Sequence, residues 1–353
     1  MKLYTNQVKS DSRLLVFNFT MDRNDPLLSH QYEAVSELAK NFENITVVTG
    51  KVGLVDSNSS LRIINTNWVP GKNLKNIYNF YLRALPIIIR GNFDSVFFHM
   101  TDLQCALLSP LITLRGKRQY LWYAHTFKSK FLIFSSYFVE GIVTSTPGSC
   151  PISGPKLVAI GQAINENQFR PWAGANLDIS QLIHVGRFDK SKKIELLIDA
   201  AAEIRKLFSD LRLTLVGSPA NLESQHWAEN LVSRSKYAVE EGWLIFKGSI
   251  PRASFPEEVQ KNGCFFHAYT GSLDKTLIEA TMIRVPVVTI NPEYREIFGT
   301  WGDSNQVDLV SEYLALRKLT KLEIEIELAR RLDIARKNHS LAHWITELTL
   351  LLR

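Results

Sequence analysis

The strongest constraint on the fold is an alternation between short apolar runs and amphipathic helical patterns, repeated along the chain. The runs are rich in β-branched and aromatic residues and mostly continuous, which is typical of strands buried on both faces. Alternating strands and helices predict parallel sheets joined by right-handed crossovers. The predicted strands are residues 13–19, 45–50, 61–68, 94–100, 119–125, 141–146, 181–186, 211–218, 244–250, 264–269 and 285–290.

The length of the chain, 353 residues, suits two domains that each bury a core of their own. Residues 161–180 separate the two runs of strands and have the Gly, Pro and Asn content of a linker. We therefore predict an α/β fold of two Rossmann-like domains that face each other across a cleft. The first spans residues 1–170 and the second residues 171–339. The apolar helix at 340–353 is expected to pack back on the first domain.

Charge is unevenly distributed between the two halves. Residues 1–175 carry 18 Lys and Arg against 11 Asp and Glu, whereas the remainder is close to neutral. This asymmetry indicates an anionic partner for the first half, although a solvated basic surface would give the same count. No helix-turn-helix signature or basic-aromatic motif is visible, so a nucleic-acid partner is not expected.

Cellular location is indicated by three further features. No apolar run approaches the ~18 residues of a membrane span, and the first 19 residues lack the pattern of a signal peptide. The three cysteines share no CxxC spacing, which argues against a zinc site or disulfide framework and fits a reducing compartment. We expect a cytoplasmic protein, peripheral on the inner face of the membrane.

The first candidate for chemistry is the stretch "IHVGRFDKSKKIELLIDAAAEI", residues 183–204. Arg187 directly follows a predicted strand, and Lys192 lies at the start of the next helix. Ligands of open α/β sheets bind beyond the carboxyl ends of the strands. Arg offers a planar fork of donors to phosphate oxygens, and Lys offers a point charge. A cation at a helix N-terminus opposes the helix dipole, so an anionic ligand is the better explanation for this pair.

The second candidate is "HAYTGSLDKTLIEATMIRVPVV", residues 267–288. A turn of small residues runs into a predicted helix, an arrangement that exposes backbone N–H groups to an anion. Asp274 and Lys275 suit either helix capping or ligand contact, and Glu279 lies about one turn into the helix. His99 and His267, which lie within predicted strands, are interpreted as structural residues or residues that line the cleft. The candidate binding residues of this stretch are Gly271, Ser272, Leu273, Asp274, Lys275, Thr276 and Glu279.

Together the two stretches resemble the second domain of the retaining glycosyltransferases of family 4, which have the GT-B fold. The resemblance implies that Arg187 and Lys192 bind the diphosphate of a nucleotide-sugar donor and that Glu279 holds the ribose hydroxyls. In the first half it continues through "DRNDPLLSHQYEAVSELAKNF", "LWYAH" and "VAIGQAINENQF", and it implies that His125 lies beside the donor sugar. The chain departs from the family pattern at Gly271, where relatives have a glutamate, and at Lys193, where they usually have glycine.

The reaction implied by the resemblance is transfer of a hexosyl group, with retention, from a nucleotide-diphosphate sugar to a hydroxyl of a glycan or lipid-linked acceptor. No DxD motif or metal-ligand spacing is present, so we expect neither a metal nor another cofactor. The two cations and the helix N-terminus would neutralise the leaving diphosphate instead. Alternatives are a nucleotide-sugar-binding GT-B protein without transferase activity, which Gly271 suggests, and a GT-B epimerase, for which no catalytic acids are evident.

Two stretches of the first half are candidates for contact with an anionic membrane. In "HTFKSKFLIFSSYF" (125–138) four phenylalanines recur at helical spacing beside Lys128 and Lys130. The stretch "KNLKNIYNFYLRALPIIIR" (72–90) is basic at both ends and apolar between. Basic residues beside an apolar face suit the headgroup boundary of an anionic bilayer. Both stretches would equally fit core helices that pack on the sheet.

Overall fold

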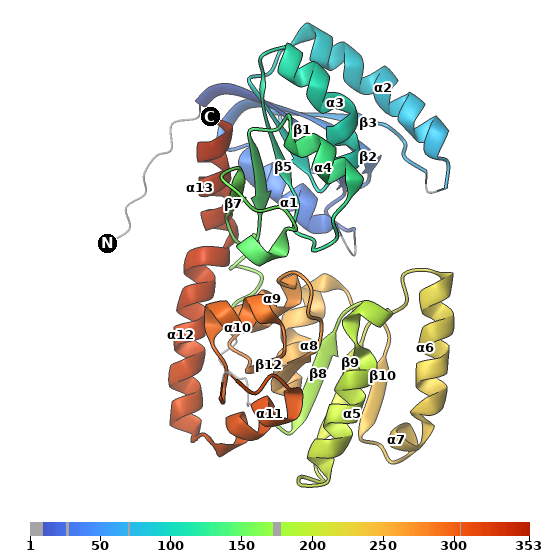
Figure 1. Ribbon diagram of the computed structural model, residues 1–353, viewed down its shortest axis with the longest axis vertical. Helices are drawn as coiled ribbons and strands as arrows, with labels where there is room; N and C mark the ends of the chain where they lie inside the picture. Colours follow the sequence, from blue (N-terminus) through green and yellow to red (C-terminus); the bar gives the residue numbers. More distant parts are fainter. Residues whose placement is uncertain (1–9, 26–27, 70, 172–177, 304) are drawn as a thin grey trace. The chain divides into compact units, whose positions relative to one another are not determined.

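The computed structural model describes residues 10–25, 28–69, 71–171, 178–303 and 305–353. Residues 1–9 of the N-terminal stretch and residues 172–177 of the predicted linker lie outside these ranges. The chain divides into two compact units (Figure 1). Unit 1 consists of Met1–Ala163 and Leu341–Arg353, and unit 2 of Ile164–Ser340.

Unit 1 is built on a seven-stranded sheet with the order β3-β2-β1-β4-β5-β6-β7, in which each paired strand is parallel to its neighbour. The strands are β1 (Ser10–Met21), β2 (Phe42–Val52), β3 (Leu61–Asn65), β4 (Ser95–His99), β5 (Arg118–Trp122), β6 (Gly141–Thr144) and β7 (Leu157–Ala159). The sequence pattern missed β7, which is only three residues long.

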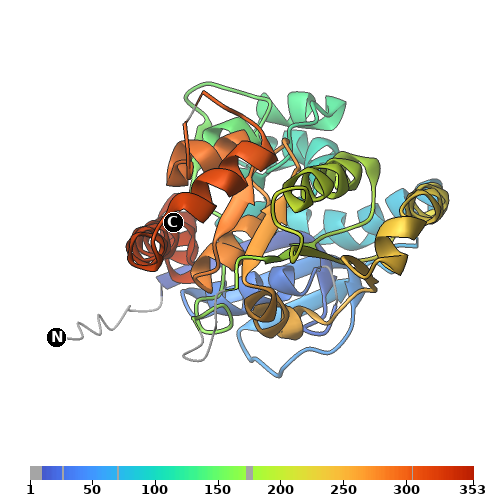
Figure 2. The same cartoon turned by 90° about the horizontal axis from the view of Figure 1, so that it is seen from below.

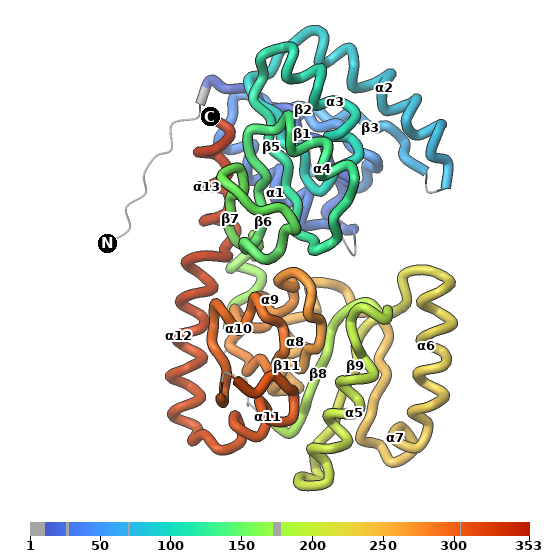
Figure 3. The backbone as a smooth tube through the Cα atoms, viewed as in Figure 1, coloured from blue at the N-terminus to red at the C-terminus, as the bar shows by residue number. Residues whose placement is uncertain are grey.

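Helices cover both faces of this sheet because each buried strand directs alternate side chains to opposite faces. Leu14 and Val16 of β1 share a core with α1 (Ser29–Leu38) and α13 (Leu341–Leu352). Leu15 and Phe17 share the other core with helices α2 (Asn73–Arg90), α3 (Asp102–Leu114) and α4 (Lys130–Ser136). Figure 3 traces α13 beside the elements of unit 1, where it contacts α1.

Unit 2 contains a five-stranded parallel sheet with the order β10-β9-β8-β11-β12. Its strands are β8 (Gln181–Val185), β9 (Arg212–Val216), β10 (Leu244–Lys247), β11 (Cys264–His267) and β12 (Val287–Thr289). Its helices are α5 (Ile194–Arg205), α6 (Leu222–Arg234), α7 (Lys236–Glu240), α8 (Phe255–Asn262), α9 (Lys275–Met282), α10 (Pro292–Phe298), α11 (Leu309–Lys318) and α12 (Lys321–His339).

The helices of unit 2 lie on both faces of its sheet (Figure 2). Leu182 of β8 and Phe266 of β11 belong to one core, whereas Ile183 and Phe265 belong to the other. Residues 222–240 form two helices and not one, since α6 ends at Arg234 and α7 begins at Lys236, with Ser235 between them. The predicted α/β fold with two parallel-sheet, Rossmann-like domains is confirmed.

Candidate functional site

The strand order of unit 2 places a topological switch point between β8 and β11. From β8 the chain continues to β9 and β10 on one side, while β11 and β12 lie on the other. Ligands of doubly wound sheets bind outside the carboxyl ends of the two strands at such a point. The loops that follow β8 and β11 lie within the two stretches singled out in the sequence.

The loop after β8 carries Arg187 and leads into a short 3₁₀ helix, η2 (Lys190–Lys192). Arg187 is exposed, and its Nε lies 3.7 Å from a carboxylate oxygen of Asp189. Asp189 caps η2 by accepting the N–H of Ser191 at 3.0 Å. The residue that follows η2, Lys193, has φ 51°, a left-handed conformation that costs a side-chain-bearing residue about 1 kcal/mol. Its ammonium donates to Thr270 Oγ1 at 2.8 Å.

Glycines allow the ends of the strands to pack closely here. A Cβ atom at Gly217, just after β9, would lie 1.8 Å from the carbonyl oxygen of Gly186. A Cβ atom at Gly186 would lie 2.9 Å from Nε2 of His184. The backbone at Gly186, directly before Arg187, therefore packs against the buried imidazole of His184.

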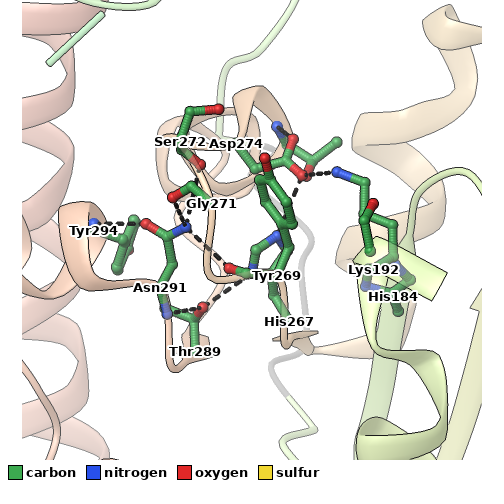
Figure 4. A network of polar contacts seen from close by, with 12 residues as sticks. His184, Lys192, His267, Tyr269, Gly271, Ser272, Asp274, Thr289, Asn291 and Tyr294 are labelled. Atoms are coloured by element: carbon green, nitrogen blue, oxygen red, sulfur yellow. Dashed lines mark hydrogen bonds and ion pairs between the residues drawn. The ribbon is translucent and has the colours of Figure 1, made fainter. Parts of the chain in front are cut away.

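Lys192 points from the first loop to the second (Figure 4). Its ammonium pairs with Oδ2 of Asp274 and lies 4.2 Å from the centre of the Tyr269 ring. The side chains of Lys192 and Asp274 are only 12% and 15% exposed. Burial alone would raise the pKa of Asp274, but Lys192 and His267 together hold that pKa well below its ordinary value. The pair is thus an ion pair at neutral pH.

The second loop, residues 268–274, is held by one buried amide. Nδ2 of Asn291 donates to the carbonyl oxygens of Tyr269 at 3.0 Å, Ser272 at 3.2 Å and Gly271 at 3.4 Å. Asn291 also caps α10 by accepting the N–H of Tyr294 at 3.0 Å. Because one side chain fixes both the loop and the helix start, the loop has a defined shape (Figure 4).

Asp274 is the N-cap of α9, where its Oδ1 accepts the N–H of Thr276 at 3.4 Å. The sequence predicts that backbone N–H groups at the start of this helix face an anion. The N–H of Thr276 already donates to the Asp274 carboxylate, which would compete with an anion for it. The side chain of Leu273 belongs to the hydrophobic core, and Ser272 is buried. Lys275 and Thr276 are half-buried in the first turn of α9.

At Gly271, where the family that the sequence resembles has glutamate, the space for a side chain is filled by Tyr269. A Cβ atom on residue 271 would lie 2.1 Å from Oη of Tyr269 and 2.3 Å from its Cζ. The glycine is therefore matched to the tyrosine two residues before it. The same tyrosine ring contacts the Lys192 ammonium.

Glu279 lies inside α9 with 1% of its surface exposed, and Oε1 pairs with the guanidinium of Arg252. Burial raises the pKa of Glu279, while Arg252 acts in the opposite direction. Arg252 comes from the 3₁₀ helix η3 (Arg252–Ser254) and also lies 5.1 Å from the centre of the Phe169 ring.

Sequence reasoning missed Arg252, Tyr269 and Asn291. The first carried a recognisable signal, since Arg252 follows the carboxyl end of the strand next to β9. The dipeptide Asn291-Pro292 is typical of a helix start, but nothing in it reveals that the amide reaches three carbonyls of another loop.

Known proteins resemble this chain in the sequence of unit 2 and in the fold. Residues 166–337, nearly all of unit 2, match the family model described as glycosyl transferases group 1. No curated protein sequence matches the chain. The chain has the GT-B fold.

Solved structures with this fold are similar over almost the entire chain. HepE from Anabaena, solved in complex with UDP and glucose, has a TM-score of 0.71 at 12% identity, covering 97% of this chain and 99% of that one. A sucrose-phosphate synthase from Thermosynechococcus elongatus has a TM-score of 0.69 at 15% identity, covering 96% and 98%. A glycosyltransferase from Rickettsia africae has a TM-score of 0.70 at 11% identity, covering 97% and 98%.

In unit 1 of this GT-B chain, His125 lies just beyond β5 rather than within the strand, which ends at Trp122. The imidazole is exposed and contacts the Tyr123 ring edge-on, with 5.6 Å between the ring centres. Tyr123 in turn donates its hydroxyl to the carbonyl oxygen of Phe127 at 2.7 Å.

The predicted apolar stripe at residues 125–138 is only partly helical. The helix α4 covers Lys130–Ser136, so Phe127 precedes it and Phe138 follows it. Ser129, which caps the helix by accepting the N–H of Phe131 at 3.1 Å, explains the late start. Within the described ranges, no helix combines the length and apolar character needed to cross a membrane.

Proposed function

We propose that the chain is a retaining glycosyltransferase of family 4 that transfers a hexosyl group from a nucleotide-diphosphate sugar to a hydroxyl of its acceptor. The observation that carries the proposal is the ion pair of Lys192 with Asp274 at the capped start of α9, at the switch point of unit 2 and inside the region that matches group 1 glycosyl transferases. Arg187 lies in the same loop as Lys192, directly after β8. Cations at this position suit a diphosphate.

The chemistry assigned to the site is stabilisation of the leaving group. As the bond between the sugar and the diphosphate breaks, negative charge develops on the phosphate oxygens, and donors already in place lower the barrier. Arg187 is exposed in the loop after β8 and would supply a planar fork, while the half-buried Lys192 would supply a point charge. The departing phosphate accepts the proton of the acceptor hydroxyl, so the scheme requires no protein base.

Glu279 is assigned to the ribose of the donor. Its Oε1 is held by Arg252, which orients the buried carboxylate. A carboxylate fixed in this way accepts hydrogen bonds from hydroxyl groups without first losing conformational freedom. Gly271, Ser272, Leu273, Asp274, Lys275 and Thr276 would form the wall of the donor site, with main-chain groups contributing at Leu273.

His125 is assigned to the donor sugar, on the basis of the family resemblance and its exposed position after β5. The first donor to test is UDP-glucose, because the structurally similar HepE has been solved with UDP-glucose and with UDP. We infer that the reaction needs no metal ion, since Arg187 and Lys192 supply the charge that a divalent cation supplies elsewhere.

The second candidate is a nucleotide-sugar-binding GT-B protein without transferase activity. It is favoured by Gly271, which removes the glutamate of the family, and by the Tyr269 ring that fills its space. This alternative shares the donor site and differs only in turnover.

The acceptor is assigned to unit 1, and we propose that it is glycan-linked or lipid-linked in cell-surface polysaccharide or glycolipid synthesis. Helix α2 presents a continuous apolar stripe to solvent, in which Leu74 is 86% and Tyr78 64% exposed, followed by Leu82 and Ile89. Lys75, Arg83 and Arg90 are also exposed, and α2 contains no acidic residue. This combination suits peripheral contact with an anionic membrane from the cytoplasm.

The decisive experiment is turnover of UDP-, GDP- and ADP-hexoses in excess EDTA, with membrane lipid extract as the source of acceptor. Transfer of label to the lipid or glycan fraction with the anomeric configuration retained supports the proposal. Donor binding without transfer or hydrolysis supports the non-catalytic alternative. Activity that disappears in EDTA and returns with Mg²⁺ or Mn²⁺ contradicts the metal-free scheme.

A further inference from the structure

Lys192 ends a row of buried polar groups, of which the proposed function gives His267 and Thr289 no role (Figure 4). Thr289 Oγ1, at the end of β12, accepts the N–H of Asn291 at 3.1 Å. The same hydroxyl lies 3.0 Å from Nδ1 of His267, at the end of β11. Nε2 of His267 lies 3.3 Å from Oδ2 of Asp274. Lys192 pairs with that same oxygen.

The hydrogen-bond partners determine the tautomer of His267. Asp274 is ionised, because its pKa is held well below the ordinary value, so its Oδ2 only accepts. The proton of the imidazole must therefore lie on Nε2. Burial lowers the pKa of His267, which keeps the ring neutral and leaves Nδ1 as an acceptor for the Thr289 hydroxyl. Nε2 of His267 therefore donates to Asp274, and Nδ1 accepts from the hydroxyl of Thr289.

The two oxygens of Asp274 have separate partners. Oδ1 accepts the N–H of Thr276 and begins α9, while Oδ2 receives both His267 and Lys192. A carboxylate held from three sides has one orientation, and His267 is the buried partner on the side away from solvent, with none of its surface exposed. The imidazole thereby restricts where the lysine ammonium lies.

The other groups that face His267 do not compete for this role. The His184 ring is 5.9 Å away, and its Nδ1 lies 3.1 Å from the carbonyl oxygen of Phe266, to which it donates. Burial lowers the pKa of His184 to about 3, so this ring is neutral as well. Tyr269 packs edge-on at 6.4 Å through its uncharged ring.

We propose that His267 is a positioning residue for the donor site: as a neutral ring protonated on Nε2, it fixes Asp274 and through it the ammonium of Lys192. The inference rests on the proposed function in one respect, that the ligand of Lys192 is the diphosphate of the donor. Donation from His267 also disperses the charge of Asp274, which weakens the hold of that carboxylate on Lys192 and leaves the ammonium available to an anion.

Binding to matched variants tests the proposal. The probes are UDP, GDP, ADP and inorganic pyrophosphate, measured by calorimetry. His267→Phe keeps a ring of similar size but no donor, and it should weaken binding about tenfold. His267→Gln places an amide N–H near the position of Nε2 and should stay within about threefold of wild type. Equal losses in the two variants, or none in the phenylalanine variant, would overturn the proposal.

A double-mutant cycle tests whether the effect passes through Asp274. In an Asp274→Asn background, His267→Phe should change affinity by less than about twofold, because the link to Lys192 is already broken. Fully additive losses would mean that His267 acts by another route. Thermal unfolding of each variant separates loss of affinity from loss of fold.

A third measurement needs neither ligand nor a His267 variant. Nitrogen-15 spectra of the wild-type imidazoles should show His267 protonated on Nε2 and not on Nδ1, and Lys192→Ala should shift its signals. A ring protonated on Nδ1, or signals indifferent to Lys192→Ala, would overturn the positioning role. If wild type binds none of the probes, the proposed function fails, while these spectra still decide the link between His267 and Lys192.

Discussion

The ammonium of Lys192 lies 4.2 Å from the centre of the Tyr269 ring, although the two residues follow different strands of the sheet. The same ammonium pairs with Asp274, so one side chain joins the loop after β8 to the start of α9. A cation that is half-buried, stacked on an aromatic ring and paired with a capping carboxylate loses little freedom when it binds a ligand. This preorganisation distinguishes Lys192 from the exposed lysines around it.

Replacing Lys193 with glycine should stabilise unit 2. Its φ of 51° is strained for lysine and unstrained for glycine, so Lys193→Gly should raise the free energy of unfolding by about 0.5–1 kcal/mol. Urea unfolding of wild type and variant measures the difference. Lys190→Gly is the matched control, because Lys190 lies in η2 without a positive φ and should lower stability instead. A loss of stability in Lys193→Gly would mean that its contact with Thr270 outweighs the backbone strain.

Glu279→Gln should discriminate between nucleotides. If the carboxylate accepts hydrogen bonds from both ribose hydroxyls, the variant should bind a ribonucleoside diphosphate about 1–3 kcal/mol more weakly than wild type does. The loss of binding free energy should be smaller for the 2′-deoxy analogue. Calorimetric titration of both ligands into both proteins gives the comparison. Because the variant also loses the ion pair with Arg252, its thermal stability is measured alongside. Equal losses for the two nucleotides would place the ribose elsewhere.

Stability should fall in mild acid because of His184. Its folded pKa of about 3 lies below the ordinary 6.5, so the unfolded chain takes up the proton first. The stabilisation is complete above the ordinary pKa and is lost as pH falls towards the folded one. Between pH of about 6.5 and 5, the His184→Asn variant should lose about 1–2 kcal/mol less than wild type. Parallel curves for the two proteins would show that His184 is not the titrating group.

Helix α2 should bind anionic vesicles. Flotation with phosphatidylglycerol vesicles should recover the wild-type protein at low salt and progressively less as salt is raised. Leu74→Ser with Tyr78→Ser should reduce recovery, since these side chains form the exposed apolar stripe. Leu322→Ser with Ile326→Ser is the control, because these residues are similarly exposed on α12, which carries acidic residues. Equal recovery of both variants would remove α2 as the contact.

Much of the fold followed from the sequence because buried parallel strands leave long apolar runs. The strands β8, β9 and β11 fall inside the runs expected for them, and Arg187 and Lys192 follow β8 as the pattern indicated. The strand β7 was missed because it is only three residues long and its apolar run is correspondingly short. The helical stripe predicted at 125–138 is longer than the helix found there, because the periodicity of the phenylalanines does not reveal the N-cap at Ser129.

The interior of the site was less accessible to sequence reasoning, since its contacts join loops far apart in the chain. The pairs Lys192–Asp274 and Arg252–Glu279 are separated by 82 and 27 residues. No local pattern specifies such partners. The match between Gly271 and Tyr269 is local, but it depends on the direction of a ring that only the packed loop defines.

The most direct test of the donor site is titration of UDP, GDP and ADP, in excess EDTA, into wild type, Arg187→Ala, Lys192→Ala and the control Lys190→Ala. Lys190 is an exposed neighbour in η2 without a predicted ligand contact. A charge-assisted contact is worth about 1.5–3 kcal/mol, so Arg187→Ala and Lys192→Ala should each weaken the preferred nucleotide at least about tenfold, while Lys190→Ala stays near wild type. Wild-type affinity in both site variants, or no binding of any nucleotide to wild type, would contradict the account.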